Sequence, residues 1–311
     1  TMAVYDFFIS HPTFFLITVF FFSLLVGSFL NVVIYRLPIM LQKEWQTECM
    51  EFLNESKEDK GKDNENHNKN NSKITVKDST TDIFNLSVPR SRCPSCSHPI
   101  KAWENIPVIS WLMLQGKCSA CSSKISIRYP IVELLTALLS VLVAYTFGVQ
   151  WFTLAAIVLT WALIVLTMID FDTHLLPDNI TLPFLWLGIF LSLIQVSPIP
   201  LQSSIIGAMA GYLILWTVYQ LFKLLTGKEG MGFGDFKLLA LLGAWLGWQS
   251  LPLILLLSAL VGALVGISLI IFRGRDKNIP IPFGPYLSAA GFISLIWGES
   301  LHQAYFNMVG L

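Results

Sequence analysis

Long apolar runs separated by short polar links dominate the pattern of hydrophobic and polar positions along this chain. Eight runs stand out, at roughly 12–36, 129–147, 151–169, 179–197, 201–222, 235–248, 252–272 and 284–306. A helix rises about 1.5 Å per residue and the hydrocarbon core of a bilayer is about 30 Å thick, so about 20 apolar residues cross it. The pattern predicts an all-α polytopic membrane protein with about eight transmembrane helices.

The positive charges sort onto one side of the predicted membrane. If the eight runs alternate in direction, all 20 Lys and Arg residues fall in one set of intervening segments, most of them between Arg36 and Arg128. Cytoplasmic loops carry an excess of Lys and Arg. We therefore expect the long segment after the first run to be cytoplasmic and both termini to be periplasmic.

Composition agrees with this prediction. Hydrophobic residues make up 54% of the chain and charged residues only 13%, which excludes an ordinary soluble domain. The net charge of zero says nothing about nucleic acid, and what matters is the asymmetry of charge across the bilayer. For this membrane protein we predict no nucleic-acid partner. The first apolar run continues into a polar segment without a small-residue cleavage site, which favours a retained helix over a signal peptide.

The cysteines indicate a metal site in the cytoplasmic segment. Two C-x2-C pairs, Cys93 with Cys96 and Cys118 with Cys121, are separated by 21 residues. Disulfides are disfavoured in a reducing compartment, and two such pairs offer the four tetrahedral thiolates that structural zinc prefers. We predict one structural zinc ion per chain, with four free or redox-active thiols as the alternative. Cys49 is left over and is expected to be inert.

The long cytoplasmic segment divides into three parts. Residues 42–53 mix acidic and apolar side chains and could form an amphipathic surface helix. Residues 54–82 are rich in Asn, Lys, Asp and Glu and cannot bury enough apolar area to offset their ordering entropy, which predicts a disordered insert. The zinc module follows at 90–128. Beyond it, Glu133 lies one turn inside the second run, where a carboxylate is costly, so it is either functional or a paired structural residue.

Two further acidic residues lie at the predicted cytoplasmic surface. Asp170 ends the third apolar run, and Asp235 begins the sixth, within Gly230-Met-Gly-Phe-Gly-Asp-Phe-Lys237. The sixth run has only 14 residues, about 21 Å of helix, so Asp235 should lie inside the protein with water nearby. Peptide hydrolysis needs a base to activate water and an acid to protonate the carbonyl, and two carboxyls sharing one proton supply both. Asp170 and Asp235 are therefore predicted to form a catalytic dyad.

Neighbouring residues have simpler expected roles. Asp178 follows a proline and precedes an apolar run, so it is expected to be the N-cap of the fourth helix. Asp172 and His174 are expected to be solvated residues at the interface. A carboxylate is disfavoured at a helix C-terminus and favoured at an N-terminus, which predicts that Asp170 holds the shared proton and that Asp235 is ionised.

Several motifs occur in a fixed order along nearly the whole chain: Gly27-Ser-Phe-Leu-Asn-Val-Val-Ile-Tyr-Arg-Leu-Pro38, the paired C-x2-C motifs, Trp103-Glu-Asn-Ile-Pro107, Arg128-Tyr-Pro-Ile-Val-Glu133, the Asp170 segment, Gly227-Lys-Glu-Gly-Met-Gly-Phe-Gly-Asp-Phe-Lys237 and Pro280-Ile-Pro-Phe-Gly-Pro285. Together these motifs resemble the type IV prepilin peptidase / N-methyltransferase family, whose members are bifunctional leader peptidases and GxGD-type membrane aspartyl proteases. Only the insert at 54–82 departs from the family pattern.

The resemblance implies an activity for each part of the chain. Residues 1–36 would hold the first transmembrane helix, 37–128 the methyltransferase region and 129–311 the aspartyl peptidase bundle. The enzyme would lie in the bacterial cell inner membrane, in contact with lipid, with type IV prepilins and type II secretion pseudopilins as protein substrates. It would remove their short basic leader using Asp170 and Asp235.

The resemblance also implies methylation of the new N-terminal residue, with S-adenosylmethionine as the methyl donor. No glycine-rich βαβ fingerprint is present, so a Rossmann-type cofactor fold is not indicated. Polar residues of the N-terminal region could orient the amine or hold the cofactor, or could be structural: Asn31, Arg36, Glu104, Asn105, Arg128 and Glu133.

Two other classes of protein remain as alternatives. A transporter could use Asp170 and Asp235 to relay protons or ions, but transporters often contain two similar halves, and we detect no such repeat. A zinc-stabilised membrane scaffold without chemistry would leave the glycines around Asp235 unexplained.

Overall fold

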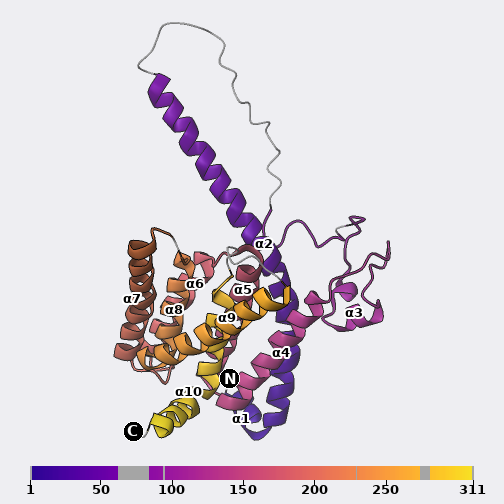
Figure 1. Ribbon diagram of the computed structural model, residues 1–311. Coiled ribbons are helices and arrows are strands. Elements are labelled where there is room, and N and C mark those ends of the chain that lie inside the picture. Colours follow the sequence, from indigo (N-terminus) through magenta and orange to yellow (C-terminus); the bar gives the residue numbers. More distant parts are fainter. Residues whose placement is uncertain (1, 62–83, 94, 229, 274–280, 310–311) are drawn as a thin grey trace.

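The computed structural model describes residues 2–61, 84–93, 95–228, 230–273 and 281–309. Within these ranges the chain is helical and contains no strand, although isolated bridges pair Arg92 with Pro99 and Lys117 with Lys124. The elements, labelled in Figure 1, are α1 (Met2–Ser10), α2 (Pro12–Gly61), η1 (Ala102–Asn105), α3 (Ile109–Met113), α4 (Arg128–Phe147), α5 (Trp151–Thr173), α6 (Asp178–Leu193), α7 (Leu201–Thr226), α8 (Phe233–Leu246), η2 (Trp248–Ser250), α9 (Leu251–Arg273) and α10 (Gly284–Val309).

Each of the eight predicted apolar runs lies on one helix, namely α2 and α4 to α10. Five candidate spans are long and apolar enough to cross a membrane, in α2, α4, α5, α7 and the combined η2–α9 segment. Helices α6 and α8 are shorter, with 16 and 14 residues. The chain is therefore all-helical within the described ranges and has the character of a multi-pass membrane protein.

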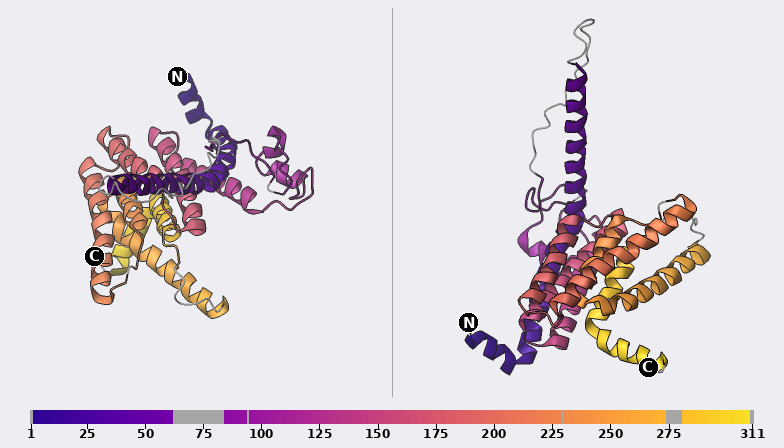
Figure 2. Two further views of the ribbon diagram at one scale, coloured as in Figure 1. Left: turned by 90° about the horizontal axis from the view of Figure 1, so that it is seen from above. Right: turned by 90° about the vertical axis from the view of Figure 1, so that its left-hand side faces the viewer.

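Helix α2 differs from the sequence-based expectation. It continues through Pro38 without a break and ends at Gly61, so the predicted surface helix at 42–53 is its direct extension. Residues 54–61 of the predicted disordered insert are helical, because Glu, Lys and Ser extend a helix that is already nucleated. The remainder of the insert, 62–82, lies outside the described residues. Figure 1 and the right-hand view of Figure 2 show α2 extending far beyond the bundle.

Helix α8 lies beside α7 and contacts α6, α7 and α10 (Figure 1). Its residues from Asp235 to Trp245 are buried except Lys237, and the indole N–H of Trp245 donates to the carbonyl of Phe184 in α6 at 2.8 Å. A helix that is apolar on all sides belongs in a protein interior. Protein rather than lipid therefore surrounds most of this 14-residue helix, apart from the exposed Phe233 at its start, which explains how so short a helix fits among longer ones.

Glycines allow α7 to approach α8 at backbone distance. A side chain at Gly207 would collide with the backbone of Gly243, and one at Gly243 would collide with the backbone of Gly207. Further along, a Cβ at Gly211 would lie 2.6 Å from the carbonyl oxygen of Leu239. This close packing fixes the position of the helix that carries Asp235.

Candidate aspartate dyad and metal-binding cluster

Asp170 lies in the last turn of α5 and its side chain is buried. The helix ends just before His174, which adopts a left-handed conformation with φ 55°. The N–H of His174 donates to the carbonyl of Asp170 at 2.9 Å. Its exposed side chain agrees with the expected interfacial position. The Asp170 carboxyl thus lies at the end of α5, where the chain turns towards α6.

Asp235 lies in the first turn of α8, and its side chain is also buried. The helix is preceded by Gly232, which as the N-cap offers no side chain to the free N–H groups of this turn. A Cβ at Gly232 would lie 4.0 Å from the Oδ2 atom of Asp235, so the backbone of Gly232 lies close to the Asp235 carboxyl. Asp235 is therefore an inward-facing carboxyl in a glycine-rich turn.

The structure brings Asp170 and Asp235 close enough for their charges to interact. A third element contributes to the same place, because the backbone N–H of Gly284, the first residue of α10, donates to Oδ2 of Asp170 at 3.0 Å. Leu176 packs beside the dyad, since Cβ atoms at Gly234 and Gly284 would lie 2.7 and 3.2 Å from its side chain. Two helix N-termini and one helix C-terminus thus converge on a pair of buried carboxyls.

Gly284 was not predicted to have a role in the site. It falls within the Pro280–Pro285 motif that carried part of the family resemblance, but nothing in that motif indicates which carboxyl its N–H would reach. A Cβ at Gly284 would lie 2.6 Å from Oδ2 of Asp170, so only glycine allows this approach.

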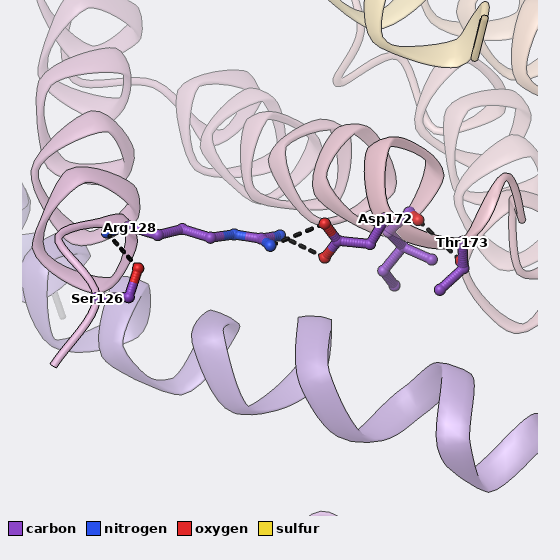
Figure 3. A network of polar contacts seen from close by, with 5 residues as sticks. Ser126, Arg128, Asp172 and Thr173 are labelled. Carbon is purple, nitrogen blue, oxygen red and sulfur yellow. Dashed lines mark hydrogen bonds and ion pairs between the residues drawn. The ribbon is translucent and has the colours of Figure 1, made fainter. Parts of the chain in front are cut away.

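The structure adds a partner for one neighbouring acid and corrects the expectation for another. Asp172 is exposed, as expected, but it is also paired, because Arg128 donates to both of its oxygens at 2.8 and 2.6 Å (Figure 3). Asp178 is not an N-cap, because Pro177 occupies that position and Asp178 is the first helical residue of α6. Its carboxylate instead accepts two hydrogen bonds from Lys237 at 2.7 and 2.6 Å.

The four paired cysteines form a cluster in which all the Sγ atoms lie within 4.8 Å of one another. Both pairs stand on equivalent turns: the N–H of Cys93 donates to the carbonyl of His98, and that of Cys118 donates to Ser123, each at 2.9 Å. Four sulfur atoms from two such turns could hold a metal ion, and the donor set suits zinc.

Hydrogen bonds within the cluster perturb the thiols. The Ser123 hydroxyl and the backbone N–H groups of Cys96 and Ser95 lower the pKa of Cys93 to about 6. The Ser123 hydroxyl likewise lowers the pKa of Cys121. The His98 N–H acts in the same direction on Cys96, but burial and the neighbouring thiols outweigh it and raise its pKa to about 12. Such a set of coupled thiols loses its protons when a dication binds.

Two of the predicted methyltransferase residues line the junction of α2 and α4. The Asn31 side chain donates to the carbonyl of Tyr129 at 3.2 Å, and the Glu133 carboxylate accepts the N–H of Val108 at 2.8 Å. Both side chains are buried. A Cβ at Gly27 would lie 2.8 Å from Cα of Glu133, so the two helices touch here.

Three more of these residues lie in different surroundings. Arg36 is buried, and its guanidinium donates to the carbonyls of residues 85, 86 and 89, which ties α2 to the segment before the cysteine module. Glu104 accepts the N–H of Lys101 at 2.9 Å, and this bond together with the Ser119 hydroxyl lowers its pKa. Asn105 is exposed at the end of η1. The sixth, Arg128, is paired with Asp172.

Comparison with known proteins defines the class. Residues 21–147 match the family described as Bacterial Peptidase A24 N-terminal domain, and residues 157–267 match the Type IV leader peptidase family. The chain is thus a peptidase of the multi-pass membrane type. No solved structure matches it.

Curated relatives identify the family within that class. A protein from Aeromonas salmonicida is 56% identical over 291 residues, covering 94% of each chain. Relatives from Stutzerimonas stutzeri (49% over 310 residues, 100% of each chain) and Pseudomonas aeruginosa (47% over 309 residues, 99% of each chain) are similar over their whole length. All three are named prepilin leader peptidase/N-methyltransferase, and the chain belongs to this enzyme family.

Proposed function

We propose that this enzyme cleaves the short basic leader from type IV prepilins and type II secretion pseudopilins, and then methylates the new N-terminal residue. The observation that carries the peptidase half is the meeting, at the ends of two helices, of two buried carboxyls, Asp170 and Asp235, which are 65 residues apart in sequence. A structural role alone does not account for two interacting carboxyls that are both buried.

In this proposal one carboxylate removes a proton from the attacking water and the other carboxyl donates a proton to the scissile carbonyl oxygen. Helix ends alone would leave the resting proton on Asp170, but α10 also directs its N-terminus at Asp170 through the Gly284 N–H. At Asp170 the effects of the α5 and α10 dipoles oppose each other, each about 0.3–1 kcal/mol, and up to about 2 kcal/mol when partly buried. The α8 N-terminus favours an ionised Asp235 by a similar amount, so the hydrogen bond from Gly284 is the term that distinguishes the two carboxyls. A hydrogen bond to a charged acceptor is worth about 1 kcal/mol more than one to a neutral acceptor. We therefore assign ionised Asp170 as the base and protonated Asp235 as the acid.

The membrane arrangement fits this reaction. Eight crossings, with both termini periplasmic and the zinc module cytoplasmic, would place Asp170 and Asp235 at the cytoplasmic side of the bacterial inner membrane. The Lys and Arg residues of the described ranges lie at that side under this arrangement. A substrate with a membrane helix and a basic cytoplasmic leader would then present the peptide bond between them to the dyad.

The N-terminal region is assigned the second activity. Cys93, Cys96, Cys118 and Cys121 would hold a structural zinc ion that stabilises the module. S-adenosylmethionine, when bound, would supply the methyl group. Asn31 and Glu133, both buried at the α2–α4 junction next to this module, are the side chains best placed to orient the substrate amine.

The test is incubation of the purified enzyme in detergent with a prepilin, followed by mass spectrometry. The expected products are a chain lighter by the mass of the leader, and, with S-adenosylmethionine added, a further gain of one methyl group. An intact prepilin after prolonged incubation would contradict the peptidase assignment. Ion uptake into vesicles without cleavage would favour the transporter alternative.

A further inference from the structure

Both aspartates lie in terminal helical turns, which are the least constrained parts of a helix. Asp170 belongs to the last turn of α5, which ends at Thr173. Asp235 belongs to the first turn of α8, where no side chain caps the helix. Terminal turns lack part of the helical hydrogen bonding and fray readily. A reaction that needs two carboxyls at a fixed separation therefore needs another restraint on both turns.

A charged residue two positions beyond each aspartate provides such a restraint. Asp172 follows Asp170 and binds Arg128 of α4 through both carboxylate oxygens (Figure 3). Lys237 follows Asp235 and binds both oxygens of Asp178 in α6. Each dyad turn is thus tied laterally to a neighbouring helix by an ion pair with two short hydrogen bonds.

The first pair also joins the two parts of the chain. Arg128 is the first residue of α4 and directly follows the cysteine module, and its N–H lies 3.3 Å from the Ser126 hydroxyl (Figure 3). At the other end, the Thr173 hydroxyl donates to the carbonyl of Ile169 at 2.8 Å, which closes the last turn of α5. The turn that holds Asp170 is therefore bonded to the start of α4, directly after the cysteine module.

We propose that Arg128–Asp172 and Lys237–Asp178 are positioning pairs that hold the two aspartates at the separation required for leader cleavage. The proposal rests on the peptidase function proposed above. It also reassigns Arg128, which we had considered as a cofactor-binding residue, to the positioning of Asp170.

The exposure of the two ion pairs indicates that they position the aspartates rather than stabilise the fold. The side chains of Arg128 and Asp172 are 38% and 34% exposed, and those of Lys237 and Asp178 are 27% and 51% exposed. Ion pairs this exposed contribute little to folding stability. A displacement of about 1 Å in a catalytic group, in contrast, can lower a rate by about a hundredfold. Loss of a pair should therefore slow the reaction in a protein that still folds.

Charge reversal tests the first pair. In the full-length enzyme with a prepilin substrate, Arg128→Asp and Asp172→Arg should each lower kcat by about ten- to a hundredfold, with little change in KM. The double variant should recover most of the wild-type kcat. Reversal suits the helix ends, because it places an acid at the start of α4 and a base at the end of α5. Thermal unfolding of all variants should stay within a few degrees of wild type.

The matched control is Lys124→Asp, which makes the same charge change four residues away. Lys124 is exposed and forms no ion pair with any residue in the described ranges. Its kcat should be that of wild type. Equal kcat values for Arg128→Asp and wild type, or a double reversal as slow as the single variants, would overturn the proposal. Absence of cleavage by the wild-type enzyme would instead contradict the peptidase function itself.

The second pair has its own conservative test. Lys237→Gln removes the charge and should lower kcat, whereas Lys237→Arg keeps a cation beside Asp178 and should retain most activity. Unchanged kcat in Lys237→Gln would show that this pair does not position Asp235. Restored activity in the Arg variant separates a positioning role from a general loss of structure.

Discussion

Gly284→Ala should slow leader cleavage without unfolding the enzyme. The added Cβ would lie 2.6 Å from Oδ2 of Asp170 and 3.2 Å from its Cγ, and ordinary van der Waals contact begins at 3.4 Å. Helix α10 or the carboxyl must therefore move by roughly 0.8 Å. The alanine keeps the backbone N–H, so the change tests position rather than loss of a donor.

The size of the effect follows from the displacement. A shift of this order in a catalytic group costs about ten- to a hundredfold in kcat, or about 1.4–2.8 kcal/mol in the barrier. KM should change little, because the substrate does not have to contact Gly284. Replacing glycine by alanine in a helix is otherwise neutral or stabilising by up to about 1 kcal/mol, so the unfolding temperature should not fall by more than a few degrees.

The assay is steady-state cleavage of a prepilin by the purified variant, with thermal unfolding measured in parallel. Gly298→Ala, in the same helix, is the matched control, because its Cβ would meet Ser294 Oγ at 3.5 Å, an ordinary contact. Wild-type kcat in Gly284→Ala would refute the idea that close packing of α10 sets the position of Asp170.

Three further predictions follow from the module, the insert and the helix packing. Replacing any one of Cys93, Cys96, Cys118 and Cys121 by Ser should release one zinc ion per chain, measured by elemental analysis, and should loosen the module while affecting cleavage only indirectly; zinc-free wild-type protein that was never exposed to chelator would contradict this. Deleting 54–82 and joining the ends with about ten Gly/Ser residues should leave both activities intact, because loop length costs little, and a folded but inactive deletion would show that the insert recognises substrate. Gly243→Val should lower the unfolding temperature, because any side chain there collides with the backbone of Gly207, and an unchanged temperature would mean that α7 and α8 separate at no cost.

The apolar runs were sufficient to predict the helical segments α2 and α4 to α10, apart from the extension of α2 to Gly61, because membrane helices depend on local composition. The same local patterns drew attention to Asp170 and Asp235, which the structure buries, and to the four cysteines, which it brings together. What the sequence did not reveal depends on which helices are neighbours. Arg128 lies 44 residues from Asp172, and Lys237 lies 59 residues from Asp178, so no periodicity indicates either pair.

The continuation of α2 through Pro38 and the contact of Gly284 with Asp170 were also not predicted from the sequence. Pro38 usually ends a helix, but the residues on both sides favour helix strongly enough that α2 continues. The contact of Gly284 with Asp170 joins residues 114 positions apart and requires the packing of α10 against α5. Tertiary neighbours, rather than local propensity, therefore account for the contacts that sequence analysis missed.

The resting proton offers a direct check on the assigned roles. Infrared difference spectra near pH 7 should show a protonated-carboxyl band that is lost in Asp235→Asn and retained in Asp170→Asn. The opposite pattern would reverse the assignment of acid and base, although the two carboxyls titrate as a pair.

The most direct measurement of the central claim is the cleavage rate of Asp170→Asn and Asp235→Asn beside wild type and Asp6→Asn, an exposed acid outside the site. The dyad predicts that each of the first two variants inserts, folds and retains bound metal but releases no leader, because one carboxyl cannot act as both acid and base. Asp6→Asn should cleave at the wild-type rate. Near-normal cleavage by either dyad variant would contradict the account.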